Sequence, residues 1–140
     1  MPVKHEITID MKAFPWAAPT ITRFGAYDTR SNKKNALKWL IKSAWDKQMI
    51  TNPVEVCLYF AFKPPKSLSK PKKHAMVAGT TNGSKIRHCV KPDLDNIFKA
   101  TCDCLKGIVI LDDNQVFKIS AEKYYAESDH IKIIVIDHGV

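Results

Sequence analysis

Apolar and polar residues alternate in several segments of the chain, and each alternation predicts a β-strand. The strongest pattern covers residues 54–62, where every second residue is apolar. A short strand is expected at residues 5–10, and longer ones at residues 115–124 and 131–137. The apolar run at residues 108–111 predicts a further short strand, followed by a turn at Asp112-Asp113-Asn114.

Two other segments have apolar residues at helical spacing. Ser31 or Asn32 can cap the first helix, which ends by Asn52-Pro53, and Gly107 is a natural stop for the second. The apolar positions are Leu37, Leu40, Ile41, Ala44 and Trp45 in the first helix, and Leu94, Ile97, Phe98, Thr101, Leu105 and Ile108 in the second. The same pattern predicts core packing for Trp39, while Pro15 and Pro19 exclude regular structure up to about residue 20.

A chain of 140 residues has the length of a single domain. We therefore expect one domain over residues 1–140, of the α/β (α+β) class, with a mixed sheet of four to five strands and two helices packed on one of its faces. No apolar stretch approaches the roughly 18 residues that a membrane span needs, which predicts a cytoplasmic location and no membrane partner. The four cysteines do not have zinc-finger spacing and are expected to be reduced, structural thiols.

The net charge of +8 is concentrated in one segment, residues 63–91, which has eight cations and no Asp or Glu. Because the remainder of the chain then sums to zero, this segment is the expected contact for a polyanion such as nucleic acid. Its prolines and its polar run at residues 80–84 predict a long mobile loop, although a solvated insertion without function has the same composition. The candidate DNA-binding residues are Lys63, Lys66, Lys70, Lys72, Lys73, Lys85, Arg87 and Lys91.

Acidic residues gather in two short motifs, Asp93-Leu94-Asp95 and Asp112-Asp113-Asn114. Pro92 favours extended backbone before the second helix, and in extended chain Asp93 and Asp95 share a side. A helix, a glycine stop and a returning strand can bring Asp113 back to them. Three carboxylates suit a hard cation such as Mg²⁺, with Asp112 as a supporting acid.

Each acidic residue also has a structural interpretation. Asp93 and Asp95 are good helix caps, and Asp112-Asp113-Asn114 is a good turn. Lys99, four residues after Asp95, is either a group that stabilises charge on a phosphate or one half of a surface ion pair. Either acidic motif alone favours the structural interpretation, whereas both together, after a cationic segment without acids, favour a metal site.

These residues resemble the RusA family of crossover-junction endodeoxyribonucleases, especially its phage and prophage members. The resemblance rests on residues 91–96, on Lys99-Ala100, Asp103, Leu105 and Gly107, and on residues 111–116. Lys63-Pro64-Pro65-Lys66-Ser67 upstream and Lys123-Tyr124 downstream are also similar. The helix departs from the usual family pattern at Phe98 and at Cys102-Asp103-Cys104, where small aliphatic residues are more usual.

The resemblance implies a homodimeric α/β nuclease that resolves four-way DNA junctions with Mg²⁺, for which Mn²⁺ can substitute, and without an organic cofactor. By motif position Asp93, Asp95 and Asp113 match the catalytic acids and Lys99 the functional lysine. The implied setting is the cytoplasm of a bacterium or of a phage-infected host. Two alternatives are a nonenzymatic nucleic-acid-binding module and a nuclease acting on other branched DNA or on RNA.

Overall fold

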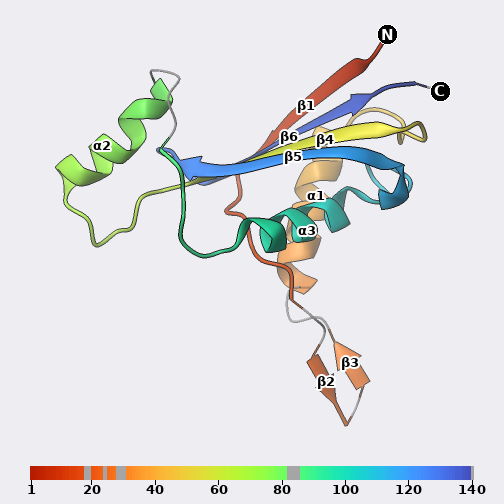
Figure 1. Ribbon diagram of the computed structural model, residues 1–140. Coiled ribbons are helices and arrows are strands. Elements are labelled where there is room, and N and C mark those ends of the chain that lie inside the picture. Colours follow the sequence, from red (N-terminus) through yellow and green to blue (C-terminus); the bar gives the residue numbers. More distant parts are fainter. Residues whose placement is uncertain (18–19, 24, 28–30, 82–85, 140) are drawn as a thin grey trace.

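A computed structural model describes residues 1–17, 20–23, 25–27, 31–81 and 86–139. Four strands form a mixed, open sheet in the order β1-β6-β4-β5, in which β4 and β5 are parallel and the other neighbours antiparallel. The strands are β1 (Val3–Ile9), β4 (Val54–Phe62), β5 (Val116–Tyr125) and β6 (His130–Asp137). A separate two-stranded hairpin, β2 (Thr20–Thr22) and β3 (Gly25–Tyr27), extends away from the sheet (Figure 1).

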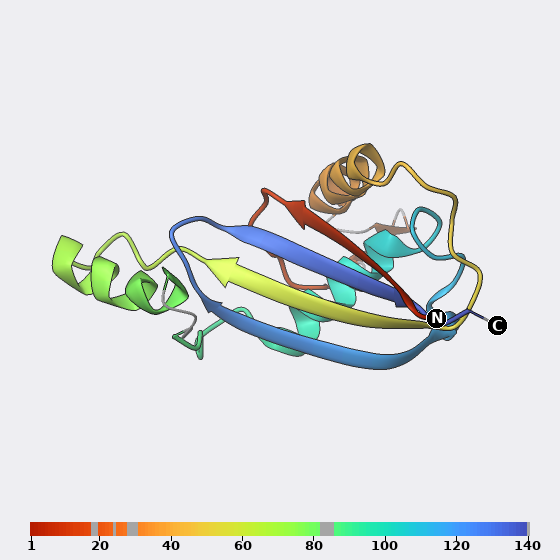
Figure 2. The same ribbon diagram turned by 90° about the horizontal axis from the view of Figure 1, so that it is seen from above.

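Helices α1 (Ser31–Ala44) and α3 (Leu94–Leu105) lie side by side on one face of this sheet (Figures 1 and 2). The core lies between the two layers, because alternate residues of the central strands β4 and β6 point toward the helices. Its largest fully buried side chains include Leu58, Phe60, Ile131 and Ile133. The predicted fold class, a mixed sheet with two helices on one face, is therefore confirmed.

Helix α3 buries the stripe that its sequence predicts. Ile97, Ala100, Thr101, Cys104 and Leu105 are buried against the sheet and α1. The helix ends where Gly107 adopts a positive φ of 83°, which glycine allows at little cost. Phe98 and Cys102 pack against the same core from its margin. The residues that depart from the usual family pattern are therefore part of the packing.

The basic segment is not the continuous loop predicted above, because it contains helix α2 (Lys70–Thr81). Ser69 precedes this helix, and its Oγ accepts a hydrogen bond from the backbone N–H of Lys72 at 3.5 Å. Pro71 lies in the first turn, where its missing N–H costs nothing. These local signals support a helix, which projects beyond the end of the sheet (Figure 1).

Two further expectations were wrong. Residues 108–111 form a turn with single bridges from Ile110 to Ile50 and Lys106, not a strand. Trp39 is 68% exposed, although Trp45 is buried as predicted. Residue 39 is two positions from Leu37, and about 200° around the helix separates their side chains.

All four cysteines are free, as expected, and Cys57 and Cys104 are buried. Among the described residues, no helix combines the length and apolar character that a membrane span requires.

Candidate functional site

Asp93 lies at the start of α3 on a loop that Lys123 holds in place. The Lys123 ammonium, which extends from β5, donates hydrogen bonds to the carbonyl oxygens of Val90 at 2.5 Å and Pro92 at 2.6 Å. Asp93 is extended, as expected for the position after a proline, and its exposed side chain makes no capping hydrogen bond. Leu94 turns inward against the core. The Asp93 carboxylate therefore faces solvent, and the capping interpretation fails for this residue.

Asp95 lies in the first turn of α3, where its Oδ1 accepts a hydrogen bond from the Asn96 N–H at 3.0 Å. The segment that follows β1 crosses this end of the helix, because the Trp16 N–H donates to the Asn96 carbonyl at 2.9 Å. The Lys99 Nζ lies 3.6 Å from the centre of the Trp16 ring, a close cation–π contact. No role was predicted for Trp16 from the sequence, yet it keeps the ammonium of Lys99 beside the first turns of α3.

Asp112 and Asp113 have different surroundings although they are adjacent. Asp112 caps the short 3₁₀ helix η1 (Asp113–Gln115), accepts from the Asp113 N–H at 3.0 Å, and pairs with Lys106 at 3.0 Å. The hydrogen bond from Lys106 is the main reason why the pKa of Asp112 is lowered. Asp113 is exposed. Asp112 therefore stabilises the turn, and Asp113 presents its carboxylate to solvent.

Gln115 anchors this turn to the rest of the molecule. Its Nε2 donates to the carbonyl oxygens of Ile50 and Asn52, both at 2.9 Å, and its Oε1 accepts from the Asp112 N–H at 2.8 Å. The position of Asp113 is therefore fixed by backbone contacts with the loop that precedes β4.

Asp113 faces the second half of α3. A pocket of about 520 Å³ between α3 and β5 is lined by Phe98, Lys99, Cys102, Asp103, Asp113, Asn114, Val116 and Ile119. Burial, followed by the nearby charges of Asp103 and Asp113, raises the pKa of Cys102 to about 12. Lys99 shares the pocket with both acids, yet within the described ranges no ion pair of 4.0 Å or less joins it to Asp95 or Asp103.

The carboxylates of Asp93 and Asp95 lie toward the other end of α3. Asp95 and Asp103 are eight residues apart, which corresponds to about 12 Å along a helix axis. In the part of the chain that the structure describes, no group of three His, Cys, Asp or Glu side chains is arranged to hold one metal ion. The exposed carboxylates have the donor chemistry that Mg²⁺ prefers, but a single chain does not bring three of them to one point.

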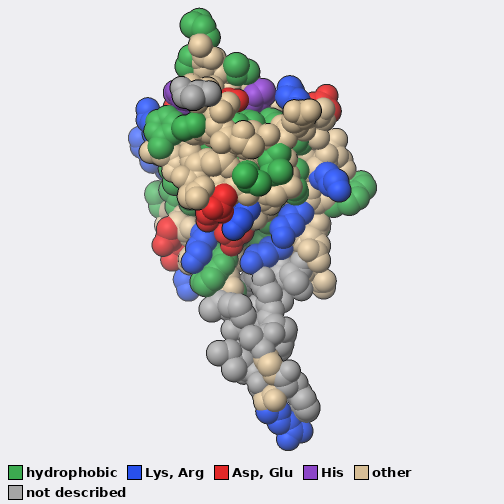
Figure 3. Space-filling view, turned by 90° about the vertical axis from the view of Figure 1, so that its right-hand side faces the viewer, with side chains coloured by type: hydrophobic (Ala, Val, Ile, Leu, Met, Phe, Trp, Pro, Cys, Tyr) green, Lys and Arg blue, Asp and Glu red, His purple; other side chains and the backbone are tan. Residues whose placement is uncertain are grey.

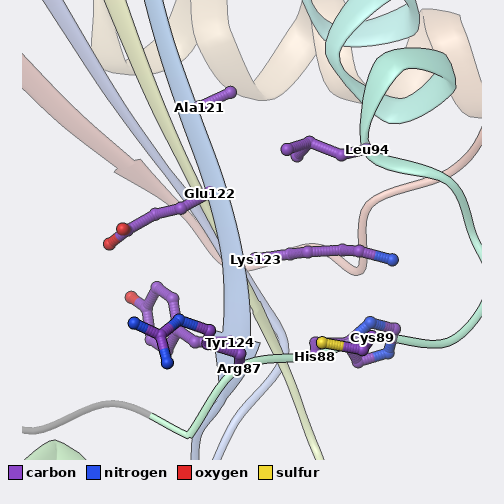
Figure 4. Close-up of a pocket in the computed structure, with 8 residues that line it drawn as sticks. All are labelled: Arg87, His88, Cys89, Leu94, Ala121, Glu122, Lys123 and Tyr124. Atoms are coloured by element: carbon purple, nitrogen blue, oxygen red, sulfur yellow. The ribbon is translucent and has the colours of Figure 1, made fainter.

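A second pocket, of about 510 Å³, opens at the edge of β5 (Figure 4). Lys123 points toward Leu94 and His88, whereas Glu122 and Tyr124 lie on the opposite side of the strand. His88 is buried between the rings of Phe62 and Tyr125, with centroids 4.3 and 4.9 Å away.

Lys123 was not predicted from the sequence to position the site. The available signal was the alternation of β5, which places Lys123 on the same side as Ala121 and Tyr125, facing the helices. A lysine at an inward position needs polar partners, and the carbonyl groups of Val90 and Pro92 provide them.

The described cations of the basic segment lie in two places. Lys63, Lys66, Lys70 and Lys73 line a pocket of about 380 Å³ with His74 and Glu127, between α2 and the ends of the strands. Arg87 and Lys91 lie in the loop that leads to Asp93, and Lys85 lies outside the described residues. Lys and Arg side chains also surround a small acidic group on the face shown in Figure 3.

Comparison with known proteins agrees with this site. The family model described as "Endodeoxyribonuclease RusA" matches residues 14–136, which is most of the chain. An uncharacterized protein of Bacillus subtilis (strain 168), YqaN, is 31% identical over 87 residues, covering 62% of this chain and 59% of that protein. The matched part thus spans about three fifths of the relative's length. The chain belongs to the RusA family of endodeoxyribonucleases.

Proposed function

We propose that the protein is a Mg²⁺-dependent, structure-specific endodeoxyribonuclease that resolves Holliday junctions by symmetric paired nicks in DNA recombination and repair. Membership of the RusA family implies a junction-resolving endonuclease. The observation that carries the proposal for this chain is Asp93: its carboxylate is exposed and uncapped, on a loop that Lys123 holds to the sheet. A carboxylate with no structural partner in such a fixed position is available for chemistry.

The proposed residue roles follow from these surroundings. Asp93, Asp95 and Asp113 would hold Mg²⁺, which when bound supplies an activated water and neutralises charge on the scissile phosphate. Trp16 keeps the Lys99 ammonium near the start of α3, where it can stabilise charge that develops on a phosphate oxygen. Asp112 supports Asp113 through η1.

The basic segment supplies the DNA contacts in this proposal. The cations around α2 project from the sheet beyond the site, and Arg87 and Lys91 lie close to Asp93 in the chain. Such a distribution suits the arms and the centre of a branched DNA, because phosphate contacts position a protein on DNA without reading sequence. A four-way junction has two-fold symmetry, so paired nicks require two sites in a homodimer.

The test compares wild type, Asp93→Asn and Asp46→Asn on a labelled four-way junction with Mg²⁺ or Mn²⁺. Asp46 is a matched control, because it is exposed and pairs only with its neighbour Lys47. We expect Asp93→Asn to lose more than about 100-fold in nicking rate, beyond the effect of losing a supporting residue, and Asp46→Asn to keep the wild-type rate.

Equal nicking by all three proteins would overturn the assignment of Asp93. Tight junction binding without nicking under any divalent ion would instead identify a nonenzymatic binding module. Competition among junction, duplex, flap and RNA substrates separates junction resolution from action on other nucleic acids.

A further inference from the structure

We propose that two copies of the chain join along the free edge of β5, antiparallel and centred on Ser120, and that Asp113 of the second copy completes each site. The proposal rests on the proposed function for the role of the carboxylates, and on the geometry of β5 alone for the interface.

Strand β5 has one paired and one largely unpaired edge. Strand β4 pairs with it over its whole length. On the other side only its C-terminal end is covered, because the Lys123 carbonyl accepts from the His88 N–H and the Tyr125 N–H donates to the Ile86 carbonyl. Among the described residues, none pairs as a strand with residues 116–122 on this side, which forms the outer edge of the sheet (Figure 2).

This free edge is apolar as well as unpaired. Phe117 is 58% and Ile119 is 52% exposed, and Ile119 continues into the pocket lined by Phe98 and Val116. Natural proteins usually protect a long edge strand with charges, a proline or a bulge, because its backbone groups otherwise pair with another strand. Here the protection is incomplete, so a second strand is the occupant that satisfies both the backbone groups and the apolar side chains.

The sequence of β5 selects a second copy as that strand. The Lys123 carbonyl and the Tyr125 N–H point to the free edge, so the backbone groups of residues 119 and 121 do too. An antiparallel pair centred on Ser120 hydrogen-bonds residue 119 to residue 121 twice. It also places Lys118 opposite Glu122 twice, and opposite charges at facing positions stabilise a register. Lys118 is 64% exposed and lies 3.7 Å from Glu55 on the same face of the sheet.

The same symmetry brings together carboxylates that one chain keeps apart. Helix α3 runs opposite to β5, since Leu94 shares a pocket with Ala121 and Lys123, and Cys102 shares one with Val116 and Ile119. A two-fold axis through Ser120 exchanges the two ends of β5. It therefore carries Asp113 of the second copy to the end of the first copy where α3 begins.

Two equivalent composite sites result, each with Asp93 and Asp95 from one copy and Asp113 from the other. This arrangement accounts for the lack of a three-carboxylate group within the described part of one chain. It also places the sites symmetrically about one axis, as paired nicks on a two-fold junction require.

Disulfide cross-linking tests the interface without any enzyme activity. Ser120→Cys is made in a Cys57→Ala, Cys89→Ser background, because the Cys57 Sγ lies 3.7 Å from the Ser120 Oγ and Cys89 is exposed. Residues on the axis of such a pair have Cβ atoms about 4.5–5.5 Å apart, close enough to bridge with small movements. We expect rapid dimer formation on non-reducing gels, and none for the control Thr8→Cys, an exposed position on β1. Equal, slow cross-linking of both variants would overturn the interface.

Charge exchange is a second test of the register. Lys118→Glu places acids opposite each other and should shift the protein toward monomer in sedimentation, whereas Lys118→Glu combined with Glu122→Lys should restore the dimer. Failure of the double variant to dimerise, when wild type does, contradicts the register.

Mixed dimers test the composite site. Asp93→Asn and Asp113→Asn are co-expressed with different tags, and the heterodimer is isolated by both tags. If sites are shared between copies, one site has both changes and the other has none, so the heterodimer nicks junctions at about half the wild-type rate. If each site lies within one chain, both sites are damaged and the heterodimer is as inactive as either parent, which overturns the proposal. Absence of nicking by wild type would instead refute the proposed function, while the cross-link still reports the interface.

Discussion

Replacing Lys123 with methionine tests whether the loop before α3 is held by this single side chain. Methionine keeps most of the length and the apolar contacts of lysine but donates no hydrogen bonds. The variant therefore removes the hydrogen bonds to the carbonyl oxygens of Val90 and Pro92. We expect the loop to loosen and the Asp93 carboxylate to leave its fixed position.

The expected magnitude follows from those two hydrogen bonds. Each is charge-assisted, and such bonds contribute about 1.5–3 kcal/mol when well buried. Lys123 is half-buried and one of its bonds is exposed, so solvent screening reduces the total destabilisation to about 2 kcal/mol. For a chain of this length, a destabilisation of that size lowers the Tm by about 7 °C.

Thermal unfolding by circular dichroism and junction nicking are measured on the same preparations. Lys132→Met is the matched control, since this lysine of β6 makes an exposed ion pair with Glu6 at 3.1 Å, worth less than about 1 kcal/mol. We expect nicking by Lys123→Met to fall by about 100-fold, because misplacing a reactive group by about 1 Å costs that much. If both variants melt together and nick equally, Lys123 does not position the site.

Three further predictions concern pH, thiols and salt. Burial, and then the charge of Lys123, lower the pKa of His88, so the unfolded chain takes up a proton first as the pH falls below about 6.5; between pH 8 and pH 5, urea unfolding should show wild type losing more stability than His88→Phe, and equal losses would contradict this. Burial raises the pKa of Cys102 to about 12 and of Cys104 to about 11, so iodoacetamide at pH 8 should first modify the exposed Cys89, whereas fast labelling of Cys102 in mass spectra would refute the burial argument. Changing Lys70, Lys72 and Lys73 together to Gln should flatten the salt dependence of junction binding by about 0.9 in log–log slope for each phosphate that the variant no longer binds, and an unchanged slope would exclude α2 from binding.

The sequence predicts best the elements whose side chains face the core. Strand β4 has the predicted limits, and α3 buries its predicted stripe, because burial selects apolar residues at the period of each element. Helix α2 packs little against the sheet, so no apolar stripe marks it. Only its local capping by Ser69 distinguishes it from a charged loop. The exposure of Trp39 was missed because size and apolarity were given more weight than its angular position on α1.

The candidate site was predictable in its parts but not in its assembly. Pro92 predicts the extended, exposed Asp93, and the Asp112-Asp113-Asn114 motif predicts a turn at the position of η1. The distance between them depends on residues 106–111. A four-residue strand there would have moved the chain about 13 Å back along α3, whereas the observed turn keeps Asp113 beside Cys102 and Asp103. Turns of this kind are set by contacts distant in sequence, here those of Gln115 with Ile50 and Asn52.

Anomalous scattering from crystals soaked in Mn²⁺ tests the proposed metal site most directly. We predict one manganese peak, or two adjacent ones, at the start of α3, ligated by Asp93 and Asp95 of one copy and by Asp113 of a second. Manganese bound only elsewhere, with these three carboxylates left in solvent, would contradict the proposed site.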